Sequence, residues 1–319
     1  MFRITLIALL ASAAVPSAYA QSNYPTRAIT LVVPFGAGSG TDVMARTLAD
    51  ELSKKVGQPV VVENRPGGAS IPAAEYVARA TPDGYTLFMG GNTTHSANPH
   101  LFKELRYDPL KDFTPISRLA TAGAVLVVSP KSGLTSIADL VKAAKADPGK
   151  LTYGASNSGS QIAAERIKRE YGIDMIRVPY KSTPQAMTDV IGGTLTMTFV
   201  DVAAALSAVK SGQVRALAIS SATRTPLMPE VATMQELGVK EFDLTFWNGL
   251  FGPAKMPSDI ATRLSKDTAE IMTTDQMKQR LSALGLDAAP LPASEMDAYI
   301  KTELGKWGAY VRESGIEPN

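Results

Sequence analysis

The chain has 319 residues, 45% of them hydrophobic, with 32 Lys and Arg against 30 Asp and Glu and no cysteine. This charge balance excludes the basic surface that nucleic acid or an acidic membrane would need, and the lack of cysteine excludes disulfides and a lipoprotein attachment site. Because the length exceeds what one hydrophobic core usually fills, we expect two domains.

The first 20 residues have the pattern of a targeting segment. Arg3 gives a basic start, residues 4–15 are largely apolar, and Ala18-Tyr19-Ala20 is a small-residue cleavage pattern. The apolar run is too short to span a membrane. We therefore expect a signal peptide that is cleaved after Ala20 and a mature protein in a bacterial periplasm.

From residue 29 onward, strand-like and helix-like segments alternate, which favours an α/β fold with mostly parallel sheets. The first strand is expected over 29–35. The helix after it runs from about Thr41 to Val56, with an apolar face and Gly57 at its end. Further strands are expected over 60–64 and 85–89, with a helix between them.

A second series begins at Ala124, with strands expected near 124–128, 151–154, 176–178, 195–200 and 214–219. A strand over 246–251 and helices from Ser258 and Ser294 follow. The last helix has an apolar stripe but no sheet of its own, so it must pack back on an earlier lobe. We expect two hinge crossovers, near 120–124 and 239–247, and two lobes: a discontinuous lobe 1 over 21–123 plus 240–319, and lobe 2 over 124–239.

One pattern occurs twice: a strand, a loop rich in Gly, Ser, Thr or Asn, and then a helix. The loops cover 36–41 and 155–160, with helices opening at Asp42 and near Gln161. Free backbone N–H groups at a helix N-terminus favour an anion. A third polar loop, 92–94, follows another strand. Two such termini on an exported chain suggest two lobes that close on a carboxylate.

These loops, with side chains at neighbouring strand ends, supply the candidate ligand-binding residues. The alternative for each loop is an ordinary N-cap or turn. Asp201 either accepts a hydrogen bond from a ligand hydroxyl or amine, or caps the helix from Val202; Phe35 is a candidate apolar wall. The full set is Phe35, Ser39, Gly40, Thr41, Asn92, Thr93, Thr94, Ala155, Ser156, Asn157, Ser158, Gln161, Tyr180 and Asp201.

Residues typical of catalysis are scarce. The only histidines are His95 and His100, and neither Gly/Ser loop forms a nucleophile elbow. No motif for a metal is present, and the dinucleotide fingerprint fails at Thr41. We expect no enzyme activity, metal or cofactor, and interpret His95 as a packing or capping histidine. A periplasmic hydrolase or isomerase that uses His95 and Asp201 stays open as an alternative.

Longer segments match a known family in order along nearly the whole mature chain. They are Tyr24-Pro25, 33–42, 62–68, 82–87, 94–99, 107–113, 178–182 and 212–218. In them the chain resembles the Bug-type periplasmic substrate-binding proteins of tripartite tricarboxylate transporters. The resemblance implies a two-lobed Venus-flytrap fold, with each lobe a sheet flanked by helices, and no catalysis.

The resemblance also implies how a ligand is held. The loops after the first and third strands, Ser39–Thr41 and Asn92–Thr94, would bind its carboxylate, and Ala155–Gln161 its other end. Asp201 matches an aspartate found in some relatives. The first loop here departs from the family's more usual Pro-Ala-Gly-Gly, and 68–71 is less rich in Gly and Asn, so the carboxylate is not identified.

The expected partners follow from the same resemblance. They are a small organic carboxylate and the membrane permease subunits of the transporter, with no nucleic acid, for a monomeric protein. A second hypothesis keeps the fold but makes the chain the ligand sensor of a two-component system, with a sensor kinase as partner.

Overall fold

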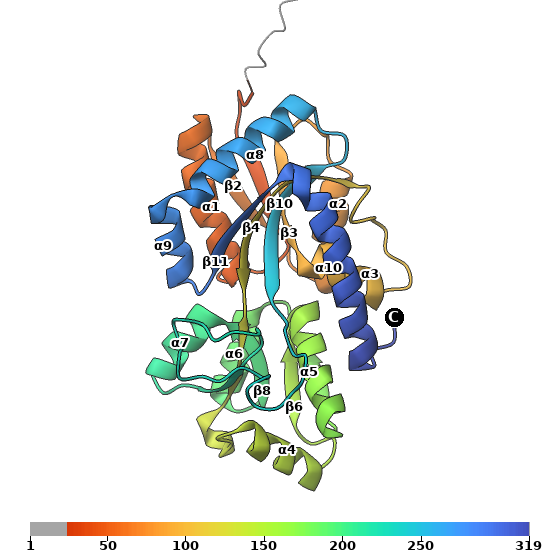
Figure 1. The fold of residues 1–319 in the computed structure, drawn as a ribbon, viewed down its shortest axis with the longest axis vertical. Helices are drawn as coiled ribbons and strands as arrows, with labels where there is room; N and C mark the ends of the chain where they lie inside the picture. Colours follow the sequence, from red (N-terminus) through yellow and green to blue (C-terminus); the bar gives the residue numbers. More distant parts are fainter. Residues whose placement is uncertain (1–23, 319) are drawn as a thin grey trace, which may run out of the picture.

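The computed structural model describes residues 24–318, so the signal peptide expected over 1–20 lies outside the described residues. Two sheets, each flanked by helices, are stacked along the long axis of the molecule (Figure 1). The first sheet has the order β11-β4-β10-β3-β1-β2. Its strands are β1 (Ile29–Val33), β2 (Val60–Asn64), β3 (Thr86–Gly91), β4 (Phe113–Ala122), β10 (Phe246–Pro253) and β11 (Asp287–Pro292).

The second sheet has the order β7-β6-β8-β5-β9. Its strands are β5 (Ala124–Val128), β6 (Thr152–Ala155), β7 (Ile176–Pro179), β8 (Met197–Asp201) and β9 (Arg215–Ile219). Strands β6, β7 and β8 run parallel to one another and are linked by helices, as the alternating pattern predicted.

Both sheets are mixed, so the expectation of mostly parallel sheets was wrong in this detail. Strand β10 is antiparallel to β3 and β4, and β5 is antiparallel to β8 and β9. The reason is the path between the sheets. Strand β4 carries the chain out of the first sheet and β10 brings it back, so these two neighbours must run in opposite directions. Strand β5 likewise begins at the junction between the sheets, where β8 ends, so β5 and β8 also run in opposite directions.

The chain changes sheet at two places. Only Gly123 separates β4 from β5, and the return passes through Leu244, whose amide bonds the Ser220 carbonyl, before β10 begins at Phe246. A Cβ at Gly123 would lie 2.4 Å from the Ser221 hydroxyl oxygen, so the crossover is closely packed. The residue boundaries that we expect for the two lobes stay a prediction.

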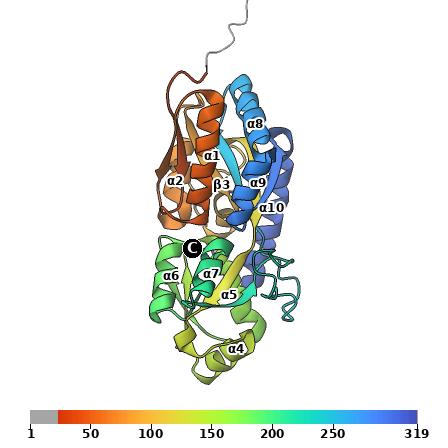
Figure 2. The same ribbon diagram turned by 90° about the vertical axis from the view of Figure 1, so that its left-hand side faces the viewer.

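Helices cover both faces of the two sheets (Figures 1 and 2). Around the first sheet lie α1 (Gly40–Val56), α2 (Ile71–Ala78), α3 (Asn98–Leu101), α8 (Ser258–Thr273), α9 (Asp275–Ala283) and α10 (Ala293–Ser314), with a 3₁₀ turn η1 (Gly68–Ser70) and a π-helical turn η2 (Thr93–Ala97). Around the second lie the turn η3 (Pro130–Ser132) and helices α4 (Ile137–Ala146), α5 (Ser158–Tyr171), α6 (Thr183–Gly192) and α7 (Val202–Lys210).

The terminal helix α10 joins the hydrophobic cores of both sheets. Met296 and Ile300 pack with Trp247 beside the first sheet. Further along the helix, Trp307 and Val311 belong to the core of the second sheet. Figure 1 shows α10 running beside the first sheet and reaching α5. The apolar stripe seen in the sequence is therefore buried against both halves of the molecule.

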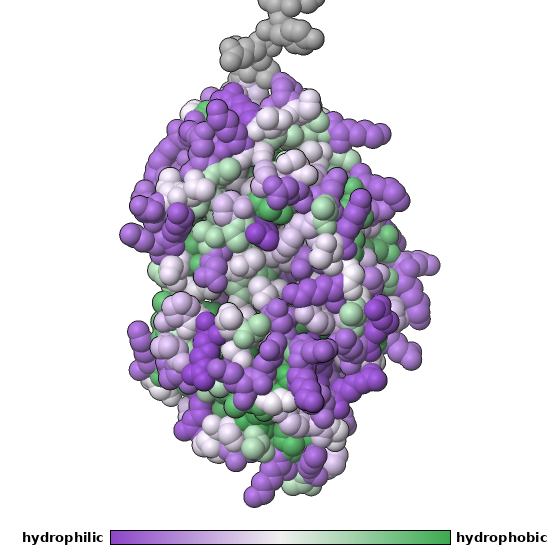
Figure 3. Space-filling view, viewed as in Figure 1, coloured by the Kyte–Doolittle hydropathy of each residue, from purple (hydrophilic) through white to green (hydrophobic). Residues whose placement is uncertain are grey.

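No helix within residues 24–318 is both long and apolar enough to cross a membrane. On the face drawn in Figure 3, hydrophilic side chains dominate and hydrophobic ones form small separate areas.

Candidate ligand-binding site

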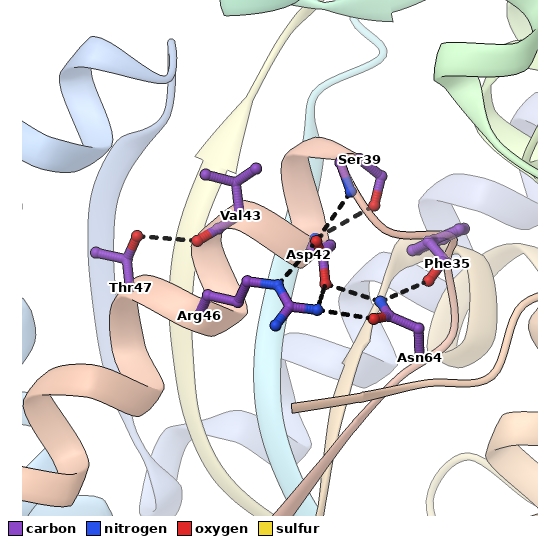
Figure 4. Close-up of polar contacts among 8 residues, drawn as sticks. Phe35, Ser39, Asp42, Val43, Arg46, Thr47 and Asn64 are labelled. Carbon is purple, nitrogen blue, oxygen red and sulfur yellow. Dashed lines mark hydrogen bonds and ion pairs between the residues drawn. The ribbon is translucent and has the colours of Figure 1, made fainter. Parts of the chain in front are cut away.

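The loop before α1 is held in shape by a buried carboxylate. Asp42 accepts hydrogen bonds from the Gly38 amide (2.9 Å), Arg46 Nε (3.1 Å) and Asn64 Nδ2 (2.8 Å), and Asn64 also donates to the Phe35 carbonyl (3.0 Å) (Figure 4). Burial opposes ionisation of Asp42, but the bonds from Arg46, Gly38 and Asn64 outweigh it and lower its pKa. The Gly-rich loop is thus fixed by the protein itself.

The first amide of α1 meets a carboxylate from the second sheet. Gly40 N–H donates to Oδ2 of Asp201, the last residue of β8, at 3.0 Å. Asp201 precedes α7 but makes no side-chain capping bond to it, so its carboxylate reaches across to α1 instead of capping its own helix. Burial raises the pKa of Asp201, and the Gly40 amide opposes that shift.

A side chain at position 40 would displace the Asp201 carboxylate from this contact. A Cβ there would lie 2.8 Å from Asp201 Cγ. The neighbouring Gly36 is also close to the second lobe, because its Cβ would lie 3.0 Å from that of Ser182. The two halves therefore touch across the junction, as the closeness of α1 to α6 and α7 in Figure 2 also indicates.

A pocket lies at this junction, with about 800 Å³ of empty space that includes its open mouth. Residues of both sheets and both crossovers line this pocket, which we call the inner pocket. The strands β1, β3 and β8 all end at it, which is where α/β sheets place ligands. Nine of the candidate residues line it: Phe35, Ser39, Gly40, Thr41, Asn92, Thr93, Thr94, Asn157 and Asp201.

The loop before α5 is capped by its own residues. Asn157 Oδ1 accepts from the Ser160 amide (2.8 Å), and Ser160 Oγ accepts from the amides of Ser156 (3.1 Å) and Asn157 (3.2 Å). The helix therefore begins at Ser158 and not near Gln161, because Asn157 is the N-cap. The sequence suggested that the backbone amides of this loop would be free to bind a ligand. Those of Ser156, Asn157 and Ser160 instead donate to side chains of the loop itself.

Ser158 contacts the first lobe. Its hydroxyl donates to Asn98 Oδ1 at 2.8 Å, and Asn98 Nδ2 donates to the Ala69 carbonyl at 2.8 Å. Both side chains are buried. Next to it, a Cβ at Gly159 would lie 2.0 Å from the Phe246 ring, so α5 and β10 approach closely here. The start of α5 is thus a contact between the two lobes.

The remaining candidates line a second, adjacent pocket, which we call the outer pocket. Phe35 and Asn157 line both pockets and so lie where the two meet. The Tyr180 hydroxyl donates to Asp189 Oδ2 (2.6 Å), and Ser156 Oγ lies 3.0 Å from Thr183 Oγ1. The candidates found only in the outer pocket are Ala155, Ser156, Ser158, Gln161 and Tyr180.

His95 is packed in an aromatic cluster. It is fully buried, stacks on Phe251 at a ring-centroid distance of 3.9 Å and lies 2.9 Å from Thr94 Oγ1 through Nδ1. Burial lowers the pKa of His95 to about 3, so the ring is neutral. It does not line the inner pocket. Within residues 24–318, no group of three or more His, Asp or Glu is placed to hold a metal ion.

Several lining residues were missed from the sequence. Asn248 of β10 donates to Thr41 Oγ1 at 3.4 Å, and its only signal was a polar side chain within an apolar strand. Ser160 belongs to the predicted second loop but was not singled out. The other residues of the inner pocket that were not predicted are Pro34, Met89, Gly90, Gly91, Ala122, Gly123, Ala124, Thr183, Phe199, Val200, Phe246 and Leu286.

Comparison with known proteins gives the family. The model of TctC, the tripartite tricarboxylate transporter family receptor, matches residues 44–316. The chain belongs to this receptor family. Among curated relatives of this receptor, the protein BugT of Bordetella pertussis is 32% identical over 311 residues, 97% of this chain and 95% of BugT. The family predicted from the sequence is therefore confirmed.

Solved structures agree with the receptor's two-lobed fold. An R. palustris protein, Rpa4515 with adipate, matches at a TM-score of 0.89 with 32% identity, over 93% of this chain and 100% of that one. The periplasmic binding protein BugD matches at 0.88 with 28% identity, over 93% and 100%. MatC from Rhodopseudomonas palustris with bound malate matches at 0.85 with 29% identity, over 90% and 100%. The predicted periplasmic-binding-protein fold is confirmed.

Proposed function

We propose that this receptor captures a small organic carboxylate between its two lobes and delivers it to the membrane permease subunits of a tripartite tricarboxylate-type transporter. We place it in the periplasm, after removal of residues 1–20. The family of the chain supports the proposal, as do the relatives whose structures hold adipate and malate.

One contact carries the proposal: the Gly40 amide already binds a carboxylate oxygen, that of Asp201. In this contact Asp201 stands in for the acid group of a ligand at the same helix terminus. A hydrogen bond to a charged acceptor contributes about 1.5–3 kcal/mol, and the helix terminus adds about 0.3–1 kcal/mol. With hydroxyl donors such as Thr41 and Thr93 nearby, binding of about micromolar strength is expected.

We also infer that the receptor releases its ligand unchanged. His95, the histidine suggested as a base, is enclosed by Phe88, Phe113 and Phe251 and does not line the inner pocket. Among residues 24–318, the only ionisable side chain that lines this pocket is Asp201. An isolated carboxylate with no paired acid, base or nucleophile is poorly suited to hydrolysis or isomerisation.

Calorimetry on the purified mature receptor tests the proposal. Small carboxylates should bind, and their neutral amides should not. Gly40→Val should abolish binding, because its side chain would fill the position of the anion. Gly305→Val is the matched control, since Gly305 is also helical but has open space around its Cβ. A folded wild-type receptor that binds no carboxylate, or a Gly40→Val variant that binds normally, would contradict the proposal.

Uptake separates transport from sensing. A strain that lacks the receptor should fail to accumulate the radiolabelled carboxylate and should recover with the wild-type chain but not with Gly40→Val. Normal uptake in that strain, together with loss of a transcriptional response to the carboxylate, would favour the sensor hypothesis instead.

A further inference from the structure

The buried ring of His95 lies against residues that line the inner pocket. A Cβ at Gly90 would lie 2.6 Å from His95 Cε1, and Gly90 lines the pocket. Thr94 also lines it, and its hydroxyl oxygen lies 2.9 Å from His95 Nδ1. The ring thus contacts two residues of the pocket wall without lining the pocket itself.

We propose that His95 is a positioning residue for the inner pocket: its Nδ1–H donates to Thr94 Oγ1 and so directs the Thr94 hydroxyl proton toward a bound anion. This inference rests on the proposed function, because it assumes that an anion occupies this pocket. It adds a residue that acts on the ligand through another side chain and touches no ligand atom itself.

The partners of the two ring nitrogens indicate which of them carries the proton. Burial lowers the pKa of His95 to about 3, so the ring is neutral and has a single N–H. Its Nε2 is buried and has no hydrogen-bond partner among residues 24–318, and the same is true of Nε1 of Trp247, whose ring centroid lies 6.3 Å away. A proton on Nε2 would therefore add a second unused donor near the indole. Because a buried N–H without an acceptor is rarer than a buried acceptor without a donor, we place the proton on Nδ1.

The surroundings of Thr94 then determine where its own proton can point. The hydroxyl oxygen accepts from the Gly91 amide (3.3 Å) and from His95 Nδ1, so both of its lone pairs are used. The only other acceptor that residues 24–318 offer to the proton is the Gly91 carbonyl at 3.4 Å, which is beyond the usual O–H···O distance. The proton is therefore available to an anion in the inner pocket. With the proton on Nε2 of His95, Thr94 would instead donate to the ring and could not donate to a ligand.

Nitrogen-15 NMR of the untagged mature receptor tests the ring first, without any ligand. The one other histidine of the chain is His100, whose Nε2 lies 2.8 Å from the Leu304 carbonyl oxygen and needs a proton to bond it. In mildly alkaline solution the two rings should therefore show opposite tautomers, Nδ1–H in His95 and Nε2–H in His100. The variant His100→Gln assigns the two sets of signals. An Nε2–H tautomer at His95 would overturn the inference and leave the proposed function standing.

A pair of Thr94 variants tests the hydroxyl. Calorimetry with succinate, malate, adipate and benzoate identifies the ligand that binds most tightly among them, which serves as the probe. Thr94→Val removes the hydroxyl at nearly the same volume and should weaken binding of the probe about ten- to a hundredfold, the effect of one hydrogen bond to a charged acceptor. Thr94→Ser keeps the hydroxyl and should bind the probe much as the wild-type receptor does.

Two replacements of His95 separate its hydrogen bond from its packing. Asparagine places an amide donor near the position of Nδ1, whereas leucine has a similar shape without a donor. His95→Leu should weaken binding of the probe about three- to tenfold, because the Thr94 hydroxyl can then turn toward the Gly91 carbonyl, and His95→Asn should recover most of that loss. In a receptor that already carries Thr94→Val, His95→Leu should cause no further loss of affinity, because it acts through that hydroxyl.

The outcomes separate this inference from the proposed function. Wild-type affinity in Thr94→Val, equal affinities of His95→Asn and His95→Leu, or an added loss from His95→Leu in the Thr94→Val receptor would each overturn the inference alone. If His95→Leu does not fold, the tautomer and the two Thr94 variants still decide it. A folded wild-type receptor that binds no carboxylate would overturn the proposed function and this inference with it.

Discussion

The starts of α1 and α5 come from the same sequence pattern but differ in what occupies them. At α1 the first amide, Gly40, donates to a carboxylate from the opposite lobe. At α5 the capping residue Asn157 and its partner Ser160 satisfy each other within the loop. The first terminus therefore offers an amide to a carboxylate from outside its own loop, whereas the second is closed by its own side chains.

The two loops also differ in how they are fixed. The loop at α1 is held by Asp42, Arg46 and Asn64 on the side away from the inner pocket, and its residues Ser39–Thr41 line that pocket. The start of α5 is fixed by the opposite lobe, which Ser158 and Gly159 contact. The same kind of loop is thus supported by its own lobe at α1 and by the opposite lobe at α5, and only its neighbours decide which.

The strongest test of this comparison removes the support behind α1. Asp42→Ala leaves the Gly38 amide without its acceptor and the Asn64 side chain with the Phe35 carbonyl alone, and should lower the free energy of unfolding by about 2–4 kcal/mol. Urea unfolding measures it, and Asp50→Ala, at an exposed position of the same helix, is the control. Equal stability of the two variants would mean that the loop does not depend on Asp42.

The effect of Asp42 should depend on pH with a defined sign. Its pKa in the folded state lies below the usual 3.8, so its stabilising effect is fully present above that value. As pH falls through the lowered pKa the carboxylate is protonated in both states and the stabilisation is lost. The stability difference between the wild-type receptor and Asp42→Ala should therefore shrink in acid.

The next test compares a methyl group at the two helix starts. Gly159→Ala would place a carbon 2.0 Å from the Phe246 ring, which is held beside Trp307, and should cost about 1–3 kcal/mol of stability. Gly40→Ala meets only the far end of the Asp201 side chain and should cost less than about 1 kcal/mol, while it displaces the carboxylate from α1. Thermal unfolding of both variants measures this difference in stability. Equal losses of stability in the two variants would contradict the prediction.

Local features of the fold were predictable from the sequence because they depend on neighbours in the chain. Helix α1 follows from its apolar spacing and from Gly57, which adopts the left-handed conformation at its end. The same holds for the positions of Gly40 and Asn92, which follow the strands β1 and β3. Strand direction was not predictable, since the pattern of Phe246–Phe251 is the same whether β10 runs parallel or antiparallel to its neighbours.

Long-range contacts explain what the sequence left open at the site. Asp201 was a candidate for ligand binding or for capping, and its actual partner, Gly40, lies 161 positions away. Asn98, which bonds Ser158 60 positions further on, carried no signal beyond its place in the segment 94–99 that resembles the family. Such pairs form only when the two lobes are in contact. The local periodicity of the sequence carries no information about that contact.

A smaller effect is expected at the α5 contact. Ser158→Ala leaves the buried Asn98 Oδ1 without a donor and should cost about 1–2 kcal/mol in urea unfolding. Because this hydroxyl is used between the lobes, the order of affinities among carboxylates should stay the same. Ser211→Ala, which removes an exposed hydroxyl, is the control. A changed ligand order in Ser158→Ala would assign the hydroxyl to the ligand.

The smallest effect concerns the carboxylate that occupies the start of α1. Asp201 competes with an anionic ligand for the Gly40 amide and repels it, so Asp201→Asn should bind a monocarboxylate severalfold tighter by calorimetry. Burial raises the pKa of Asp201 above 3.8, and protonation removes the competing charge as pH falls toward that raised value. The wild-type affinity should therefore approach that of Asp201→Asn in mild acid, and measuring both proteins at each pH cancels the ligand's own titration. Weaker binding by Asp201→Asn at every pH would show that Asp201 contacts the ligand and does not compete with it. The carboxylate of Asp201 would then not explain the difference between the two helix starts.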